Sequence, residues 1–473
     1  MKILIAYLQK KILMSYSKIV AALFLTILLT VSCKEAKKHS GSATDNKQST
    51  VAQPKWFASS NIYEVNLRQY SKEGTINEFA KSLPRLKEMG VEILWFMPVT
   101  PIGIEGRKLT SNDLGSYYAV RNYTAVNEEF GTLEDWKALV KQAHSMGFKV
   151  ITDWVANHSS PDNHWLKKYP HFYEKDSTGK FISPFDWTDT KKLNYKVPEL
   201  RDSMMAAMKF WIQETGIDGF RCDVASEVPV DFWKTCIDTL RSLKPGLFML
   251  AEGDKPELHT AGFDATYAWG AMNAMKDLYT GKSKLAQFDS ILNNNIQTFP
   301  AGSARMFFTT NHDENSWNGT EFEKFGAAYK TFAVFSQTMA QSIPLIYSGQ
   351  EMPNKKRLKF FVRDPIQWTG SYEMAPFYKT LLTLRKSNPA LAFDASFKRL
   401  ASSDNDVVMA YAREKEGRKV IVIMNLSAAG QKFSITDPKI NGEPMNVFTG
   451  IAEKISDTHQ FSIEPWGYLV YSY

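Results

Sequence analysis

Eight short apolar runs alternate with amphipathic helical segments between residue 56 and about residue 390. Three of the helical segments, 75–90, 132–147 and 198–216, open on Thr or Pro and close on Gly, the residues that cap helices. Eight strand–helix units favour a closed (β/α)8 TIM barrel over an open, doubly wound sheet. The runs are NIYEVN at Asn61, VEILWFMPV at Val91, FKVITDWV at Phe148, IDGFRCDV at Ile217, LFMLAE at Leu247, FDATYAW at Phe263, ARMFFTT at Ala304 and IPLIYSG at Ile343.

Two segments depart from this alternation. Residues from about 158 to 198 follow the third run, are rich in Trp, Asp, Pro and His, and predict a short subdomain on the barrel rim. Beyond residue 391, apolar and polar residues alternate, as in DVVMAYAREKEGRKVIVIMNLS at 406–427, which is typical of antiparallel strands. We therefore expect a barrel over 56–390 and a C-terminal antiparallel β-sandwich domain over 391–473.

The first 33 residues have the layout of an export signal. Basic residues precede the apolar run 19–33, which is short for a membrane span and ends at Cys33. The run resembles a bacterial lipoprotein signal, in which the Cys becomes the lipidated first residue, although Thr30 stands where such signals usually carry Leu. An ordinary signal peptide or anchor is the alternative. Residues 34–55 are polar and predict a disordered tether, so we expect an exported protein attached to a bacterial membrane through Cys33.

Composition narrows the classes of function. The chain has 57 Lys and Arg against 50 Asp and Glu, but much of the excess lies in the first 55 residues, and no basic stripe predicts nucleic-acid binding. Aromatic residues make up 13% of the chain, which suits stacking on ring-shaped ligands as well as core packing. Beyond the signal only Cys222 and Cys236 remain, too few for a disulfide framework. We expect both thiols to be buried in a monomeric protein.

Polar side chains follow four of the eight runs at the point where each run ends. Because barrel active sites lie at the carboxyl ends of the strands, we expect these side chains to converge. Any one of these residues alone is more commonly a helix cap or a polar residue that is hydrogen-bonded within the fold. The expectation of an active site therefore depends on their joint placement. The residues are Asp153, Asn157 and His158 after the third run, Arg221 and Asp223 after the fourth, Glu252 after the fifth, and His312 and Asp313 after the seventh.

Carboxyl groups in this arrangement favour glycoside hydrolysis, which needs one ionised and one protonated carboxyl group, roughly 5–5.5 Å apart in a retaining enzyme. Arg221 lies two residues before Asp223 on the same strand face, where its charge should lower the pKa of Asp223 and keep a nucleophile ionised. Glu252 follows LFMLA with no adjacent base, so desolvation should favour its protonated form, as an acid/base requires. Asp313 is placed to bind sugar hydroxyls.

The segments DWVANH at 153–158, GFRCD at 219–223, AE at 251–252 and TNHD at 310–313 resemble, in this order, the four motif regions of the α-amylase family, glycoside hydrolase family 13. The resemblance extends over the chain from residue 56. It implies that Asp223 is the nucleophile, Glu252 the acid/base and Asp313 the transition-state stabiliser.

The same resemblance implies further sugar contacts. His158, Arg221 and His312 fall where the family contacts the sugar at the cleavage point. Tyr118, in GSYYAVRNY at 115–123, resembles the stacking tyrosine of the family by its Tyr-x-x-x-Asn/Asp-Tyr spacing, and Tyr117 is the less favoured choice.

Calcium is a separate expectation. Many α-amylases follow the nucleophile with a Lys-His pair that helps to bind product-side sugar and calcium, whereas Ser226 and Glu227 occupy those places here. Asn157 keeps its motif position as a metal ligand and Glu227 is an oxygen donor, so a structural calcium ion stays an open alternative. We expect no cofactor to be required for the chemistry.

The resemblance implies retaining hydrolysis of α-1,4-glucosidic bonds in starch, glycogen or maltooligosaccharides. A glucosidase, a pullulan-cleaving enzyme or a glucanotransferase is the alternative within the family, because rim loops and water access decide among them. A non-catalytic glycan-binding lipoprotein, using the aromatic residues of EPWGYLVYSY at 464–473, is the alternative from another class. We expect those aromatic residues instead to seal the C-terminal domain against the barrel.

Overall fold

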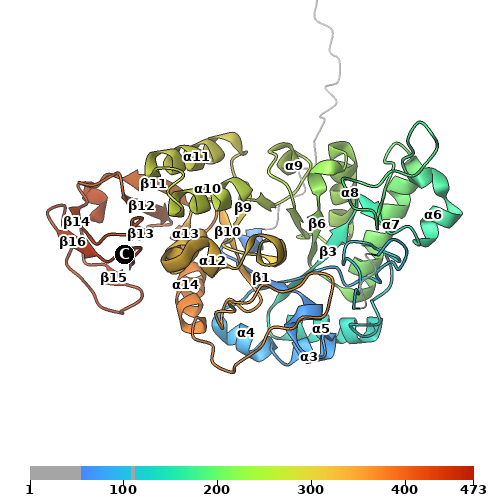
Figure 1. Ribbon diagram of the computed structural model, residues 1–473. Helices are drawn as coiled ribbons and strands as arrows, with labels where there is room; N and C mark the ends of the chain where they lie inside the picture. The colour runs from blue at the N-terminus through green and yellow to red at the C-terminus, as the bar shows by residue number, and fades with distance from the viewer. Residues whose placement is uncertain (1–54, 108–111) are drawn as a thin grey trace, which may run out of the picture. The chain divides into compact units, whose positions relative to one another are not determined.

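The computed structural model describes residues 55–107 and 112–473, so the predicted signal and the predicted tether up to residue 54 lie outside the described residues. Eight parallel strands close into a barrel in the order β1-β10-β9-β8-β7-β6-β3-β2 (Figure 1). Each strand coincides with one of the eight apolar runs, with β10 beginning one residue before its run, which confirms the predicted barrel. The strands are β1 (Ile62–Val65), β2 (Ile93–Phe96), β3 (Lys149–Val155), β6 (Gly219–Asp223), β7 (Phe248–Ala251), β8 (Ala265–Tyr267), β9 (Ala304–Phe307) and β10 (Ser342–Tyr347).

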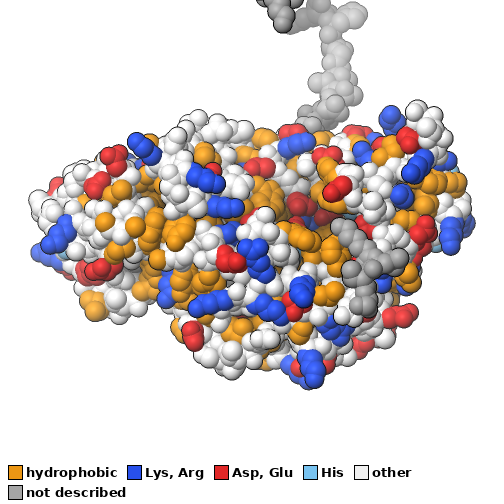
Figure 2. Space-filling view, viewed as in Figure 1, with side chains coloured by type: hydrophobic (Ala, Val, Ile, Leu, Met, Phe, Trp, Pro, Cys, Tyr) orange, Lys and Arg blue, Asp and Glu red, His pale blue; other side chains and the backbone are white. Residues whose placement is uncertain are grey.

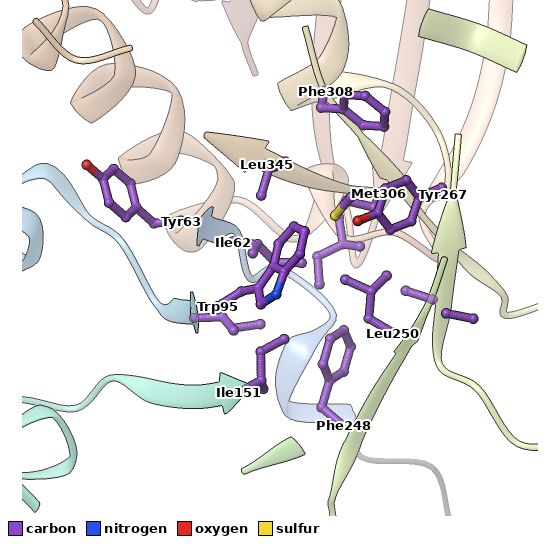
Figure 3. Close-up of a cluster of buried hydrophobic side chains, with 14 of the residues drawn as sticks. Ile62, Tyr63, Trp95, Ile151, Phe248, Leu250, Tyr267, Met306, Phe308 and Leu345 are labelled. Atoms are coloured by element: carbon purple, nitrogen blue, oxygen red, sulfur yellow. The ribbon is translucent and has the colours of Figure 1, made fainter. Parts of the chain in front are cut away.

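Apolar side chains from several strands fill the barrel. Ile62, Trp95 and Leu250, which come from three different strands, are fully buried and lie together in this cluster (Figure 3). Close packing of two strand backbones requires glycine at position 219. A Cβ atom at Gly219 would lie 2.0 Å from the carbonyl oxygen of Phe248 on the neighbouring strand. The apolar filling leaves the carboxyl end of the barrel as the place where polar side chains gather.

Helices surround the strands (Figure 1). The segment 75–90 forms two helices instead of one, because Pro84 lacks the N–H group that a continuing helix needs and lies in the first turn of the second helix. The helices are α2 (Leu67–Tyr70), α3 (Ile76–Ala80), α4 (Leu83–Met89), α5 (Leu133–Ser145), α6 (His164–Lys168), α7 (Pro198–Thr215), α8 (Val230–Leu243), α9 (Glu257–Thr260), α10 (Trp269–Tyr279), α11 (Leu285–Thr298), α12 (Glu321–Phe325), α13 (Tyr329–Thr338) and α14 (Ala375–Ser387). No helix among the described residues is long and apolar enough to span a membrane.

The rim segment after β3 contains a two-stranded antiparallel pair, β4 (His158–Ser159) and β5 (Lys191–Lys192). The C-terminal region contains a five-stranded sheet in the order β11-β12-β13-β17-β15 and a two-stranded sheet of β14 and β16, as the alternating pattern predicts. These strands are β11 (Ser396–Leu400), β12 (Val408–Lys415), β13 (Arg418–Asn425), β14 (Gln431–Ser434), β15 (Met445–Asn446), β16 (Gln460–Ile463) and β17 (Tyr468–Ser472).

The C-terminal strands pack directly on the barrel helices. The Trp466 ring lies 5.2 Å from Tyr279, and the Trp466 carbonyl accepts a hydrogen bond from Thr331. The buried Arg413 guanidinium donates to the carbonyls of Thr338 and Met339 at the end of α13. Trp466 therefore contributes to this interface. Cys222 and Cys236 are buried free thiols, as expected.

Candidate active site

Arg221 lies at the centre of a buried group of carboxylates at the carboxyl end of the barrel. Its Nη1 atom donates to Asp153 Oδ1 at 2.9 Å and to Asp223 Oδ1 at 3.1 Å, and its Nη2 atom lies 3.0 Å from Glu252 Oε2. Strand pairing explains the first contact, because Asp153 and Arg221 are register partners on β3 and β6. Three of the four motif segments thus meet at one guanidinium group.

Glu252 is held by two donors on one oxygen. Besides Arg221, the backbone N–H of Val224 donates to Glu252 Oε2 at 2.7 Å. Val224 has a φ of 35°, a left-handed conformation that is costly for a β-branched residue and is found mainly where surrounding structure enforces it. The expectation that no base adjoins Glu252 is wrong, because Arg221 reaches it from the neighbouring strand.

The ionisation of Asp223 also differs from the expectation. Burial raises the pKa of Asp223 well above its usual range, and the nearby charge of Glu252 raises it further, whereas Arg221 lowers it without cancelling these effects. Burial likewise raises the pKa of Asp153 to about 6 against the opposing charge of Arg221. One guanidinium group shared among three carboxyl groups does not lower the pKa of Asp223 as the sequence argument predicted.

His312 and Asp313 lie beside this group and form an ion pair, with His312 Nε2 3.3 Å from Asp313 Oδ2. Burial alone would lower the pKa of His312, but Asp313 and the buried Glu64 raise it well above its usual value. Burial opposes ionisation of Asp313, but the charge of His312 prevails and lowers the pKa of Asp313. Asp313 is therefore the most readily ionised carboxylate of the site.

The two tyrosines have different surroundings. Tyr118 lines the cavity, and its hydroxyl oxygen lies 2.7 Å from His312 Nε2 and 3.4 Å from Asp153 Oδ2. The Tyr117 ring is buried under the guanidinium group of Arg68, 4.2 Å from the ring centre. Tyr118 is the one that a ligand in the cavity would touch.

His158 and Asp223 present unpaired polar atoms to the cavity. His158 Nε2 and Asp223 Oδ2 lie 4.0 Å apart, and neither has a hydrogen-bond partner among the described residues. Burial lowers the pKa of His158 to about 3, so its imidazole is neutral. Buried polar atoms without partners are costly, which indicates that a polar ligand completes this part of the site.

The cavity has a volume of about 430 Å³ and carries aromatic side chains on both sides. Trp187 of the rim segment lies 5.3 Å from His158, and its neighbour Phe185 is 63% exposed. Trp317 is 55% exposed, and its ring lies 5.5 Å from Phe360, which in turn stacks on Tyr118. Sequence analysis did not identify these aromatic side chains, because they come from loops or, for Trp317, from a short π-helix at Glu314–Asn318, and these segments have no regular sequence pattern.

Asn157 and Glu227, the residues named for calcium, lie in different surroundings. The Asn157 carbonyl accepts from the Leu193 N–H, and the Asn157 amide nitrogen lies 3.3 Å from His158 Nδ1. Glu227 is exposed. Among residues 55–107 and 112–473, no group of three or more His, Cys, Asp and Glu side chains is arranged to hold a metal ion. The backbone carbonyl of Asn157 is thus already paired, and Glu227 lies at the surface.

Comparison with known proteins gives consistent matches. The model of the alpha amylase catalytic domain matches residues 51–180 and 170–242. "Alpha-amylase MalA" of Haloarcula japonica is 26% identical over 79% of this chain, and the chain spans 56% of its length. "Alpha-amylase 2" of Dictyoglomus thermophilum is 25% identical, over 84% of this chain and 74% of its own length. Other relatives are named cyclomaltodextrinase and alpha-1,4-glucan:maltose-1-phosphate maltosyltransferase.

Solved structures agree with these matches. The maltogenic α-amylase AmyB of Thermotoga neapolitana superposes with a TM-score of 0.80 at 28% identity, over 88% of this chain and 99% of that one. An α-amylase of Lactobacillus plantarum superposes with a TM-score of 0.79, also at 28% identity and with the same coverage of both chains. The barrel and these matches agree: residues 51–242 match the alpha amylase catalytic domain, and most of the chain is similar to α-amylases in sequence and in fold.

Proposed function

We propose that the protein hydrolyses α-1,4-glucosidic bonds of starch, glycogen or maltooligosaccharides with retention of the α configuration. The observation that carries this proposal is the contact of one guanidinium group, that of Arg221, with both Asp223 and Glu252 at the wall of the same cavity. This contact keeps the two carboxyl groups close, as a mechanism with a covalent intermediate requires.

The hydrogen bonds assign a task to each carboxyl oxygen. Asp223 Oδ1 is held by Arg221, whereas Asp223 Oδ2 is unpaired and is the atom that attacks the anomeric carbon. Glu252 Oε2 is held by Val224 and Arg221, so Oε1 carries the proton that is given to the leaving oxygen. The C–O bond of the substrate breaks as the ester bond to Asp223 forms. Water then attacks the ester, and Glu252 takes its proton.

The division of work requires one proton between the two carboxyl groups. Burial, and next the charge of Glu252, raise the pKa of Asp223, so a proton is readily held at this place in the free enzyme. The mechanism needs that proton on Glu252 when the substrate is bound. Asp313, kept ionised by His312, supplies negative charge next to the oxocarbenium-like transition state.

The aromatic side chains support an oligomeric substrate. Tyr118, Phe360 and Trp317 form a continuous strip that leads from the group of carboxylates to the exposed edge of the cavity, and Trp187 lies on the rim segment. Flat apolar faces of this kind stack on sugar rings. A glucan chain that extends beyond the cleaved bond would use these surfaces, whereas a single terminal glucose unit would leave Trp317 without a contact.

Proton NMR of maltoheptaose hydrolysis tests the proposal. The α-anomer should be the first new reducing end to appear, and Asp223→Asn should be the inactive control. Early β-anomer would contradict the retaining mechanism. Longer oligosaccharides without new reducing ends would identify a glucanotransferase, and glucose with maltohexaose as the sole early products would identify a glucosidase.

Export and lipid attachment at Cys33 are a separate proposal, supported by the layout of residues 1–33. Wild-type protein should appear in the membrane fraction, and Cys33→Ser should move it to the soluble fraction. Cys236→Ser, at a buried thiol of the barrel domain, is the matched control and should stay with the membrane. Membrane retention of Cys33→Ser would contradict the proposal.

A further inference from the structure

Glu64 is a fully buried carboxylate in the barrel wall. It is the one charged residue of the otherwise mostly apolar run NIYEVN at 61–66. It lies on β1 between Tyr63 and Val65, and its register partners are Trp95 on β2 and Tyr347 on β10. A buried charge in such surroundings is costly unless it is paired. Its partner is His312, whose Nδ1 atom lies 2.5 Å from Glu64 Oε1.

The second nitrogen of His312 also faces oxygen atoms. His312 Nε2 lies 2.7 Å from the Tyr118 hydroxyl oxygen and 3.3 Å from Asp313 Oδ2. A neutral imidazole carries one N–H and cannot donate from both nitrogens, whereas an imidazolium can. The positions of the two carboxylates, one at each nitrogen, therefore favour the doubly protonated ring.

We propose that Glu64 is a positioning residue that keeps His312 doubly protonated and oriented, so that the Nε2–H group faces Asp313 and the substrate site. The expected effect of Glu64 on the reaction rate rests on the proposed glycoside hydrolysis. Its effect on the protonation of His312 does not. Glu64 is enclosed in the barrel wall and acts through the ring of His312. Glu64 on β1 thus maintains the positive charge of His312, the cationic neighbour of Asp313.

The charged groups around His312 decide what happens without Glu64. Asp313 and Asp153 favour the imidazolium, whereas the cationic Arg221 opposes it and burial lowers the pKa. In Glu64→Gln the side-chain carbonyl can still accept from Nδ1–H, which keeps the ring orientation. The pKa of His312 should then fall toward its ordinary value near 6.5, and above that pH Nε2 becomes an acceptor instead of a donor.

The first test measures the pH dependence of kcat for Glu64→Gln. Activity should fall about tenfold or more near neutral pH and recover as the pH is lowered through about 6, where His312 regains its proton. Glu321→Gln is the matched control, because Glu321 is also a buried carboxylate and contacts Thr309 and Gln350 but no histidine. A uniform loss at every pH would show a merely structural role and would overturn the inference.

The second test does not depend on activity. NMR of the histidine rings in the wild-type protein, with His312 assigned by His312→Gln, should show both ring nitrogens protonated well above pH 7. In folded Glu64→Gln the same signal should titrate at lower pH. A neutral His312 ring in the wild type at pH 7 would overturn the inference, even if the protein releases the α-anomer. Release of the β-anomer with a protonated His312 would overturn the proposed function alone.

Discussion

Glu252→Gln separates the two steps of the proposed mechanism with little change of shape. The Gln amide oxygen can accept the same two hydrogen bonds, from Val224 and from Arg221, that Glu252 Oε2 accepts in the wild type. Its amide nitrogen then occupies the place of Oε1 and has no proton that it can transfer. The fold should therefore be retained, with the loss of charge at Arg221 as the main electrostatic change.

The magnitude follows from the loss of general acid catalysis, which contributes about 10²–10⁴-fold to the rate, or about 3–5 kcal/mol of barrier. The variant should lose this factor on starch, whose alkoxide leaving group needs a proton. An α-glucosyl fluoride needs little acid assistance, so the variant should still form the ester with Asp223. The breakdown of that ester should be slow, because the same residue is the base for water.

A second effect concerns Asp223. Burial is the main cause of its raised pKa, and the charge of Glu252 is the next. Gln at position 252 removes that charge, so the pKa of Asp223 should fall. The acidic limb of the pH profile, below which the nucleophile is protonated, should then move to lower pH for the fluoride substrate.

Three measurements check these expectations. Reducing-sugar release reports starch cleavage, fluoride release reports the first step across pH, and mass spectrometry detects the glucosyl-enzyme ester. Glu227→Gln, at an exposed carboxylate next to the site, is the control for charge removal and should behave as the wild type. Normal starch cleavage by Glu252→Gln, or no ester even from the fluoride, would move the acid/base assignment to another carboxyl group.

Three further predictions concern the nucleophile, the metal and the aromatic strip. Asp223→Asn should remain folded by circular dichroism and lose activity by about 10³-fold or more, since the covalent step is lost, and a variant with a tenth of the wild-type rate would exclude the role. Dialysis against EDTA should change neither kcat nor Tm, because the Asn157 carbonyl is already paired and Glu227 is exposed, and a rise in Tm on adding calcium back would contradict this. Trp317→Ala should raise KM for maltoheptaose about five- to tenfold with little change for glucosyl fluoride, and an equal rise for both substrates would exclude a role in binding the extended chain.

The sequence predicted the barrel and the convergence of the motif residues because both depend on local patterns. Each apolar run is continuous, and a polar residue at its carboxyl end must lie at one end of a parallel barrel. The break at Pro84 was not predicted, although its cause is local, since proline has no N–H group for a continuing helix. These features need no knowledge of which strands are neighbours.

Contacts between distant segments could not be predicted in this way. Glu64 and His312 are 248 positions apart, and nothing near Glu64 in the sequence indicates a histidine. The aromatic strip likewise depends on Phe360, which lies in a long segment without regular secondary structure between β10 and α14. Loops of this kind have no periodicity from which a side-chain position could be inferred.

The position of Arg221, two residues before Asp223, was not sufficient to predict the pKa of Asp223. Arg221 does contact Asp223, but the closed barrel brings further carboxyl groups to the same place. Five carboxyl groups surround two cations at this end of the barrel: Asp153, Asp223, Glu252, Asp313 and Glu64 surround Arg221 and His312. Full ionisation would leave an excess of negative charge in a buried site, and the raised pKa values of Asp153 and Asp223, each caused first by burial, agree with this. The charge balance of the whole site, rather than one neighbouring arginine, thus determines how readily Asp223 ionises.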